Sequence, residues 1–164
     1  MSKIYVDEIL PKENAQISAP NLQLPAGSVI QVVTGTASTV TSTESTTFVP
    51  TALAVSITPK YATSKILITV NGSVYHFTNA QSAVDVYRDG TSVTGQANGY
   101  EITWLNNTRG VMSASGQVID EPNTTNTVEY KVYVRKRNGD YSVDFPTGVD
   151  GGMDVLITAM EIAG

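Results

Sequence analysis

The chain of 164 residues contains no cysteine, and it has only one histidine and one tryptophan. The lack of cysteine excludes disulfide bonds and thiolate metal sites, and a single histidine leaves too few ligands for a zinc site. Charged residues are also scarce, at 15%, whereas hydrophobic residues make up 41%. The chain is therefore too apolar for a disordered protein and too sparsely charged for a helix-rich one.

Long apolar runs are missing as well. No run approaches the roughly 20 residues that span a bilayer, so we expect no membrane insertion. The first residues, Met1 to Glu8, lack the apolar core of a signal peptide, which predicts a soluble protein that is not exported by the ordinary route. A net charge of −5 repels phosphate backbones, so we expect no general binding to nucleic acid.

The residues that are abundant, namely Ser, Thr, Val, Asn and Gly, are typical of strands joined by turns. Asp89-Gly90 between two apolar runs predicts a tight hairpin. No window shows sustained helical periodicity. We therefore predict about eight to ten strands in an antiparallel β-sandwich over residues 28–164, which we call the head.

Individual strands differ in how clearly the sequence marks them. Residues 127–135 alternate, with Val128, Tyr130, Val132 and Val134 facing inward. Residues 65–77 predict a long strand with a bulge at Asn71-Gly72. Residues 111–119, rich in small side chains, predict one further strand.

The terminal stretch, residues 154–164, predicts the strand around which the head is organised. One face would carry Val155, Ile157, Ala159 and Glu161, and the other Leu156, Thr158, Met160 and Ile162. Because both faces are mostly apolar, the strand needs cover on both sides. One side can be the core, and the other can be a further copy of the chain. The residues expected at this interface are Leu156, Met160 and Ile162.

Residues 1–27 form a different kind of segment. Pro11, Pro20 and Pro25 rule out a long helix or a central strand. The segment nevertheless carries apolar residues that a lone extended chain cannot bury. We predict an extended arm that attaches to another protein, although a floppy tail remains an alternative. The apolar residues expected to attach are Ile4, Val6, Ile9 and Leu10.

Catalytic constellations are weak. His76, which a Ser-His-Asp triad would need, lies in a strand pattern, and we expect a structural role for it. No Gly-x-Ser-x-Gly motif is present. The aspartates near the last loop match no calcium-binding spacing, and the Arg135-Lys136-Arg137 run is typical of a solvated strand end. We expect neither enzymatic activity nor a cofactor or metal. The aspartates considered are Asp140, Asp144, Asp150 and Asp154.

One group of residues could contact a glycan. Aromatic faces stack on sugar rings, amides pair with hydroxyl groups, and the single tryptophan lies next to a polar loop. The competing interpretation is that the tryptophan simply fills the core. The candidate residues are Tyr100, Trp104, Asn106, Asn107 and Arg109.

An ordered set of segments resembles a known group of proteins. The segments are residues 25–33, 53–59, 62–68 and 86–91, the loop 122–127 and the ending 157–162. Together they are similar to the small fibre or tail-associated structural proteins of marine and cyanobacterial phages, over about residues 25–164.

The resemblance implies a trimeric, jelly-roll-like β-sandwich head without catalytic residues. It also implies an N-terminal arm that binds another virion protein or intertwines with its two partners, with the virion tail as the expected location. The chain departs from the family by lacking a long shaft or collagen-like repeat. Three alternatives stay open: a small tail fibre protein that touches a host surface glycan, a capsid decoration protein, and a free carbohydrate-binding module.

Overall fold

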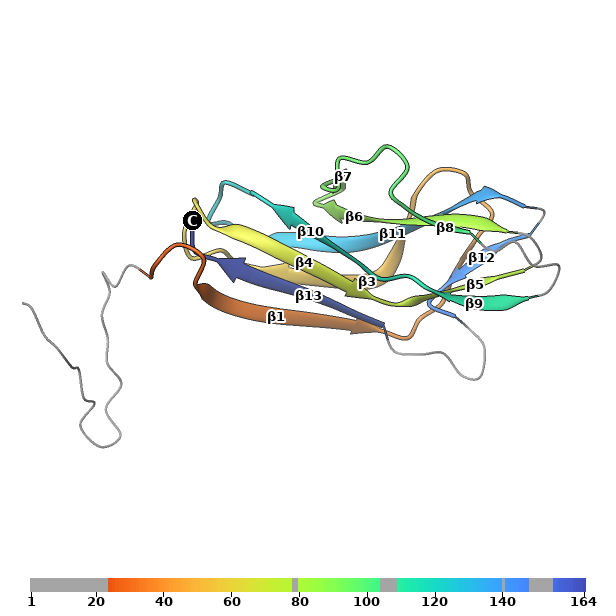
Figure 1. The fold of residues 1–164 in the computed structure, drawn as a ribbon, viewed down its shortest axis with the longest axis horizontal. Helices are drawn as coiled ribbons and strands as arrows, with labels where there is room; N and C mark the ends of the chain where they lie inside the picture. Colours follow the sequence, from red (N-terminus) through yellow and green to blue (C-terminus); the bar gives the residue numbers. More distant parts are fainter. Residues whose placement is uncertain (1–23, 78–79, 104–108, 140, 148–154) are drawn as a thin grey trace, which may run out of the picture.

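The computed structural model describes residues 24–77, 80–103, 109–139, 141–147 and 155–164. Within these ranges the chain is all-β: its strands form antiparallel sheets, and it has no helix (Figure 1). This confirms the predicted all-β class with antiparallel strands. The predicted attachment residues Ile4, Val6, Ile9 and Leu10 lie outside the described residues.

The terminal strand lies inside a four-stranded sheet, with one neighbour on each side. Its residues alternate between buried and half-exposed along the whole strand, because successive side chains of a strand point to opposite faces. Val155, Ile157, Ala159 and Glu161 are buried, which confirms the predicted inner face. The strand order is β1 (Val29–Ala37), β13 (Val155–Ile162), β4 (Lys65–Asn71) and β10 (Gly116–Asp120).

A second sheet of five strands is built around the alternating segment that begins at Val128. That segment has the predicted inward and outward residues and continues to Asn138. The hairpin at Asp89-Gly90 also forms as predicted, and both residues have positive φ angles, 47° and 87°. The strands are β3 (Val49–Ile57), β11 (Val128–Asn138), β6 (Gln81–Arg88) and β7 (Thr91–Ser92), with β8 (Tyr100–Thr103) paired to β6.

A third sheet also has four strands, but they are shorter, and it shows that one prediction was wrong. Residues 111–119 are two strands in different sheets, because the chain bends at the small residues Ser113 to Gly116. The predicted bulge at Gly72 likewise separates two strands, and Ala114 N donates a hydrogen bond to Gly72 O at this double bend. The strand order is β2 (Thr41–Thr43), β12 (Val143–Phe145), β5 (Ser73–His76) and β9 (Gly110–Ser113).

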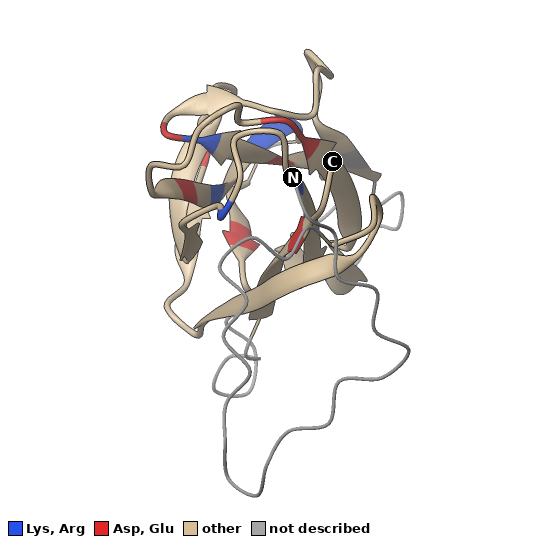
Figure 2. Cartoon of the chain, turned by 90° about the vertical axis from the view of Figure 1, so that its left-hand side faces the viewer, with Lys and Arg blue, Asp and Glu red and all other residues tan. Residues whose placement is uncertain are grey.

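The core lies between the inner faces of the sheets, and the strands surround it when the molecule is viewed along its long axis (Figure 2). Leu53, Ile68 and Ile157 are completely buried within it. The sheet that contains β13 and the five-stranded sheet approach each other closely where β1 meets β3. There a Cβ atom on Gly35 would stand 1.9 Å from the carbonyl oxygen of Ala54, so only glycine fits.

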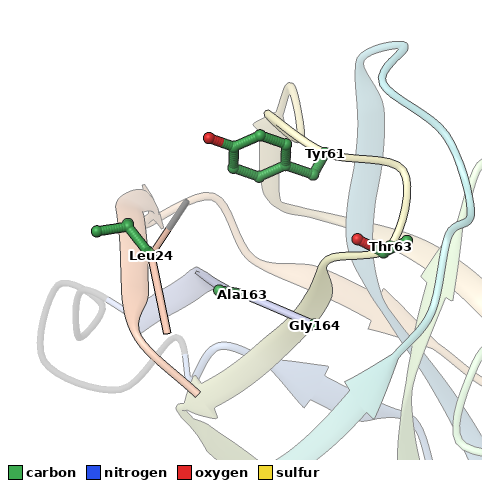
Figure 3. Close-up of a pocket in the computed structure, with 5 residues that line it drawn as sticks. All are labelled: Leu24, Tyr61, Thr63, Ala163 and Gly164. Atoms are coloured by element: carbon green, nitrogen blue, oxygen red, sulfur yellow. The ribbon is translucent and has the colours of Figure 1, made fainter. Parts of the chain in front are cut away.

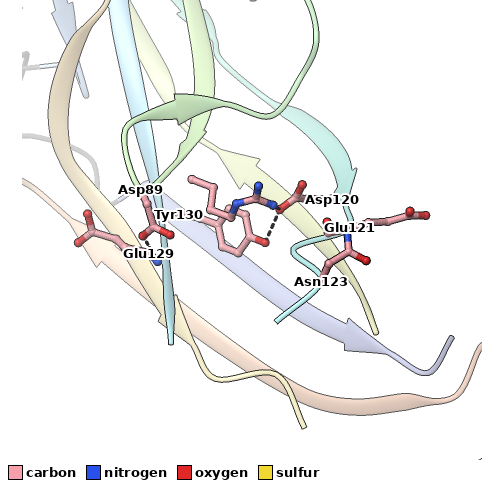
Figure 4. Close-up of polar contacts among 7 residues, drawn as sticks. Asp89, Asp120, Glu121, Asn123, Glu129 and Tyr130 are labelled. Carbon is pink, nitrogen blue, oxygen red and sulfur yellow. Dashed lines mark hydrogen bonds and ion pairs between the residues drawn. The ribbon is translucent and has the colours of Figure 1, made fainter. Parts of the chain in front are cut away.

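A polar link also joins these two sheets (Figure 4). Tyr130 on β11 is completely buried, and its hydroxyl donates a 2.7 Å hydrogen bond to Asp120 Oδ2 on β10. Arg88 on β6 donates to the same oxygen at 2.5 Å. Burial, followed by the bond to Asp120, raises the pKa of Tyr130, so its hydroxyl stays a donor.

Candidate functional site

The outward face of the four-stranded sheet that contains the terminal strand β13, called the four-stranded sheet from here on, is the main candidate site. In an antiparallel sheet, directly paired residues point to the same side. The strand register pairs Val32 with Met160, Met160 with Leu67, and Leu67 with Ile119. One continuous apolar row therefore crosses all four strands. Val32 is 50% exposed and Ile119 57% exposed, so the ends of the row are open to solvent.

The rows beside this apolar row are polar but nearly uncharged. The next row consists of Thr34, Thr158, Thr69 and Gln117. Among the outward residues of these four strands, Lys65 alone is charged, and its Nζ lies 2.9 Å from Glu121. The predicted interface residues Leu156, Met160 and Ile162 all lie on this face and are partly exposed. We call it the apolar face.

Directly behind the apolar face, the side chain of Glu161 fixes the end of the terminal strand. It is fully buried, accepts a 2.5 Å hydrogen bond from Gln31 Nε2, and accepts the backbone N–H groups of Lys60 and Tyr61. Burial alone would raise the pKa of Glu161, but these hydrogen bonds outweigh it and lower the pKa. Glu161 therefore acts as an ionised anchor for the loop after Pro59.

A small hollow lies where the arm joins the head (Figure 3). It has a volume of about 200 Å³ and is lined by Leu24, Tyr61, Thr63, Ala163 and Gly164. Gly27 N donates to Ala163 O, and Ala163 N donates to Ser28 O, both at 2.8 Å. The last residues of the predicted arm thus run alongside the end of the terminal strand.

The predicted glycan group is not assembled as one patch by its described members. Tyr100 on β8 donates its hydroxyl to Gln117 O at 2.5 Å, and its ring lies against Gly116. Arg109, which precedes β9 in another sheet, places its guanidinium 5.2 Å from the centre of the Phe77 ring. The remaining candidates, Trp104, Asn106 and Asn107, lie outside the described residues.

His76 is enclosed in the core. Its Nε2 and Ser82 Oγ share a 2.7 Å hydrogen bond, and both side chains are completely buried. Burial lowers the pKa of His76 from 6.5 to about 4, so the ring is neutral at pH 7. A substrate in solvent cannot reach this pair.

The charged clusters noted in the sequence have different surroundings. Among the described residues, no group of three or more His, Cys, Asp or Glu side chains could hold a metal ion. Asp140, Asp150 and Asp154 lie outside those residues. Arg135 is not simply solvated: its guanidinium packs 4.6 Å from the centre of the Phe48 ring and donates to Asn98 Oδ1.

The sequence alone pointed to only part of the apolar face. Leu156, Met160 and Ile162 were found because the terminal strand is apolar on both sides. Val32, Leu67 and Ile119 were missed, because only the strand register brings them into line with Met160. The sequence signal that could have revealed this row was Leu67, because it places an apolar side chain at an outward position of an alternating strand.

Comparison of the chain with protein-family models gives no match, and comparison with curated proteins gives none either. Over the described ranges, the structure contains no helix that could cross a membrane.

Proposed function

We propose that the chain is a non-enzymatic structural protein of a phage particle, namely a small trimeric tail fibre protein. In this proposal the head is a jelly-roll-like β-sandwich, and the N-terminal arm attaches it to another virion protein. The phage assignment and the number three rest on the resemblance of residues 25–164. The proposal of self-assembly rests on the apolar face.

The occupants proposed for the apolar face are the two other copies of this chain in the trimer. The row Val32–Met160–Leu67–Ile119 is apolar, and its neighbouring row is threonine-rich. Contact of this face with the same face of two partner copies around a three-fold axis removes apolar surface from water without burying an unpaired charge, which would be costly. A strongly charged partner would gain nothing from a surface whose one charge, on Lys65, already lies beside Glu121.

The size of the face explains why the arm is needed. Four strands about 4.8 Å apart and roughly seven residues long cover on the order of 400 Å². A stable interface usually takes about 800 Å² from each partner. The apolar face supplies about half of this area. We assign the rest to intertwining of the arm with the two partner copies, as the resemblance implies, whereas Ile4, Val6, Ile9 and Leu10 keep the predicted role of binding another virion protein.

A matched pair of valines tests self-assembly. Val32 is exposed on the apolar face, and Val40 is exposed in the link between β1 and β2. We expect Val32→Asp to convert the oligomer to a monomer in native mass measurements, with the circular dichroism spectrum unchanged. Val40→Asp should keep the wild-type mass. A monomeric wild-type protein, or an intact Val32→Asp oligomer, would contradict the proposal.

The location in the particle is tested separately. Gold-labelled antibody against the chain should mark the tail of purified virions in electron micrographs. Label spread regularly over the capsid would instead make the chain a decoration protein. Virions without label would contradict the phage assignment.

A further inference from the structure

The outward face of the five-stranded sheet carries a hollow that belongs to neither the apolar face nor the predicted glycan group. It has a volume of about 370 Å³ and lies between Phe48, Tyr87, Asp85 and the segment 92–97. This volume is at the lower end of the range for small-molecule sites. Asp85 and Tyr87 come from β6, whereas Phe48 directly precedes β3. The hollow is thus built from residues about 40 positions apart in the chain.

One wall of the hollow is aromatic and held in place. The ring of Tyr87 stacks on that of Tyr133, with centroids 4.0 Å apart and planes inclined by 20°. Phe48 lies 6.0 Å from Tyr87, and the guanidinium of Arg135 packs on Phe48. Arg135 also donates to Asn98 Oδ1 at 3.1 Å, which ties this wall to the loop after the hollow. Such prearranged rings offer apolar contact at little entropic cost.

The polar part of the hollow is a buried carboxylate. Asp85 is 1% exposed although it points away from the core, like its cross-strand partner Tyr133. Its Oδ1 accepts Val86 N and Thr94 Oγ1, each at 2.7 Å, and its Oδ2 accepts Ser92 Oγ at 2.8 Å. At 1% exposure the carboxylate is closed to a ligand, but it fixes the hydroxyl of Ser92, which lines the hollow, is partly exposed and can still accept a hydrogen bond.

The charges around the hollow limit what can bind there. An anion would be repelled by the buried carboxylate of Asp85, and a cation by the guanidinium beside Phe48. A neutral ring with hydroxyl groups avoids both penalties: its apolar face can lie on the aromatic wall, and a hydroxyl can donate to Ser92 Oγ, which Asp85 holds in place. Gln96, exposed at the rim, adds an amide that both donates and accepts.

We propose that this hollow binds a neutral sugar ring, held by Phe48 and Tyr87 on its face and by Ser92 and Gln96 on its hydroxyl groups. The proposal goes beyond the structural role and does not depend on it. The hollow and the apolar face lie on different sheets, so assembly through one leaves the other open.

The test uses a panel of immobilised neutral oligosaccharides ending in glucose, galactose, mannose or N-acetylglucosamine, probed with the full chain. We expect the wild type to bind at least one of them. Tyr87→Ala and Gln96→Ala should each weaken that binding about tenfold or more. The matched control is Tyr61→Ala, which removes a 44% exposed tyrosine from a different part of the head and should bind like the wild type.

Several results would overturn the proposal. One is a wild type that binds nothing on the panel, and another is binding only to sialylated or sulfated glycans added for comparison. Undiminished binding by Gln96→Ala and Tyr87→Ala would also overturn it. Gln96 is exposed on a loop, so its variant decides the question even if Tyr87→Ala does not fold.

Discussion

The outward faces of the two larger sheets differ in what lies over them. The face of the four-stranded sheet is an open apolar row with threonines beside it. On the five-stranded sheet, the segment after the Asp89-Gly90 hairpin buries Asp85 and borders stacked aromatic rings. Both faces follow from the same alternation of side chains along a strand. The difference shows that a covering segment, more than strand pattern, decides whether an outward face is an open apolar surface or a hollow with a buried polar group.

Both outward faces depend on the packing of the two larger sheets against each other. A substitution at Gly35 should disrupt this packing more than any other change considered. Gly35→Ala would force a methyl group against the carbonyl of Ala54 and push β1 away from β3. We expect a loss of about 3 kcal/mol or more in the free energy of unfolding, measured with denaturant.

Gly116→Ala is the matched control for Gly35→Ala. The nearest neighbours of its added Cβ would be atoms of the Tyr100 ring, the first at 3.2 Å, so we expect a clearly smaller loss. Equal losses in both variants would mean that the close approach of the two sheets does not require glycine at position 35.

Lowering the pH should loosen the junction between the third sheet and the five-stranded sheet, where His76 meets Ser82. The folded pKa of His76, about 4, lies below its ordinary 6.5, so the unfolded chain binds more protons between these values. Stability is therefore full above pH 6.5 and falls as the pH drops toward 4, by about 3 kcal/mol in total.

The check is denaturant unfolding at a series of pH values. The interval from pH 6.5 to 4.5 isolates His76, because Glu161, whose pKa is lowered, contributes its own loss only below its ordinary 4.5. His76→Leu should flatten this interval. If the variant kept the full slope, another group would be responsible.

A smaller effect is expected from the polar link between the four-stranded and five-stranded sheets. Asp120→Ala leaves the buried Tyr130 hydroxyl and the Arg88 guanidinium without their shared acceptor. We expect a loss of about 2 kcal/mol in thermal or chemical unfolding. Tyr130→Phe removes a single donor and should cost about 1 kcal/mol. The opposite order would indicate that Arg88 finds another partner.

Local chemistry predicted the parts of this molecule that depend on near neighbours. The Asp-Gly pair placed the hairpin, and the two-residue period of the terminal strand gave its buried side. The bend between β9 and β10 was missed because small residues are compatible with either a continuous or a broken strand. The apolar row and the Phe48–Tyr87–Tyr133 cluster were missed because both depend on long-range register, which sequence spacing does not contain.

The pairing of Gly27 with Ala163 has a mechanical consequence. Residues before Gly27 lead directly into β1, and β1 pairs with β13 over nearly its full length. A pull on those residues, with the far end of the head held, would run along the strand and load these pairs together in shear. Strands loaded in this way part only when many hydrogen bonds break at once, so a tether attached here would pull along the direction in which the sheet resists separation best.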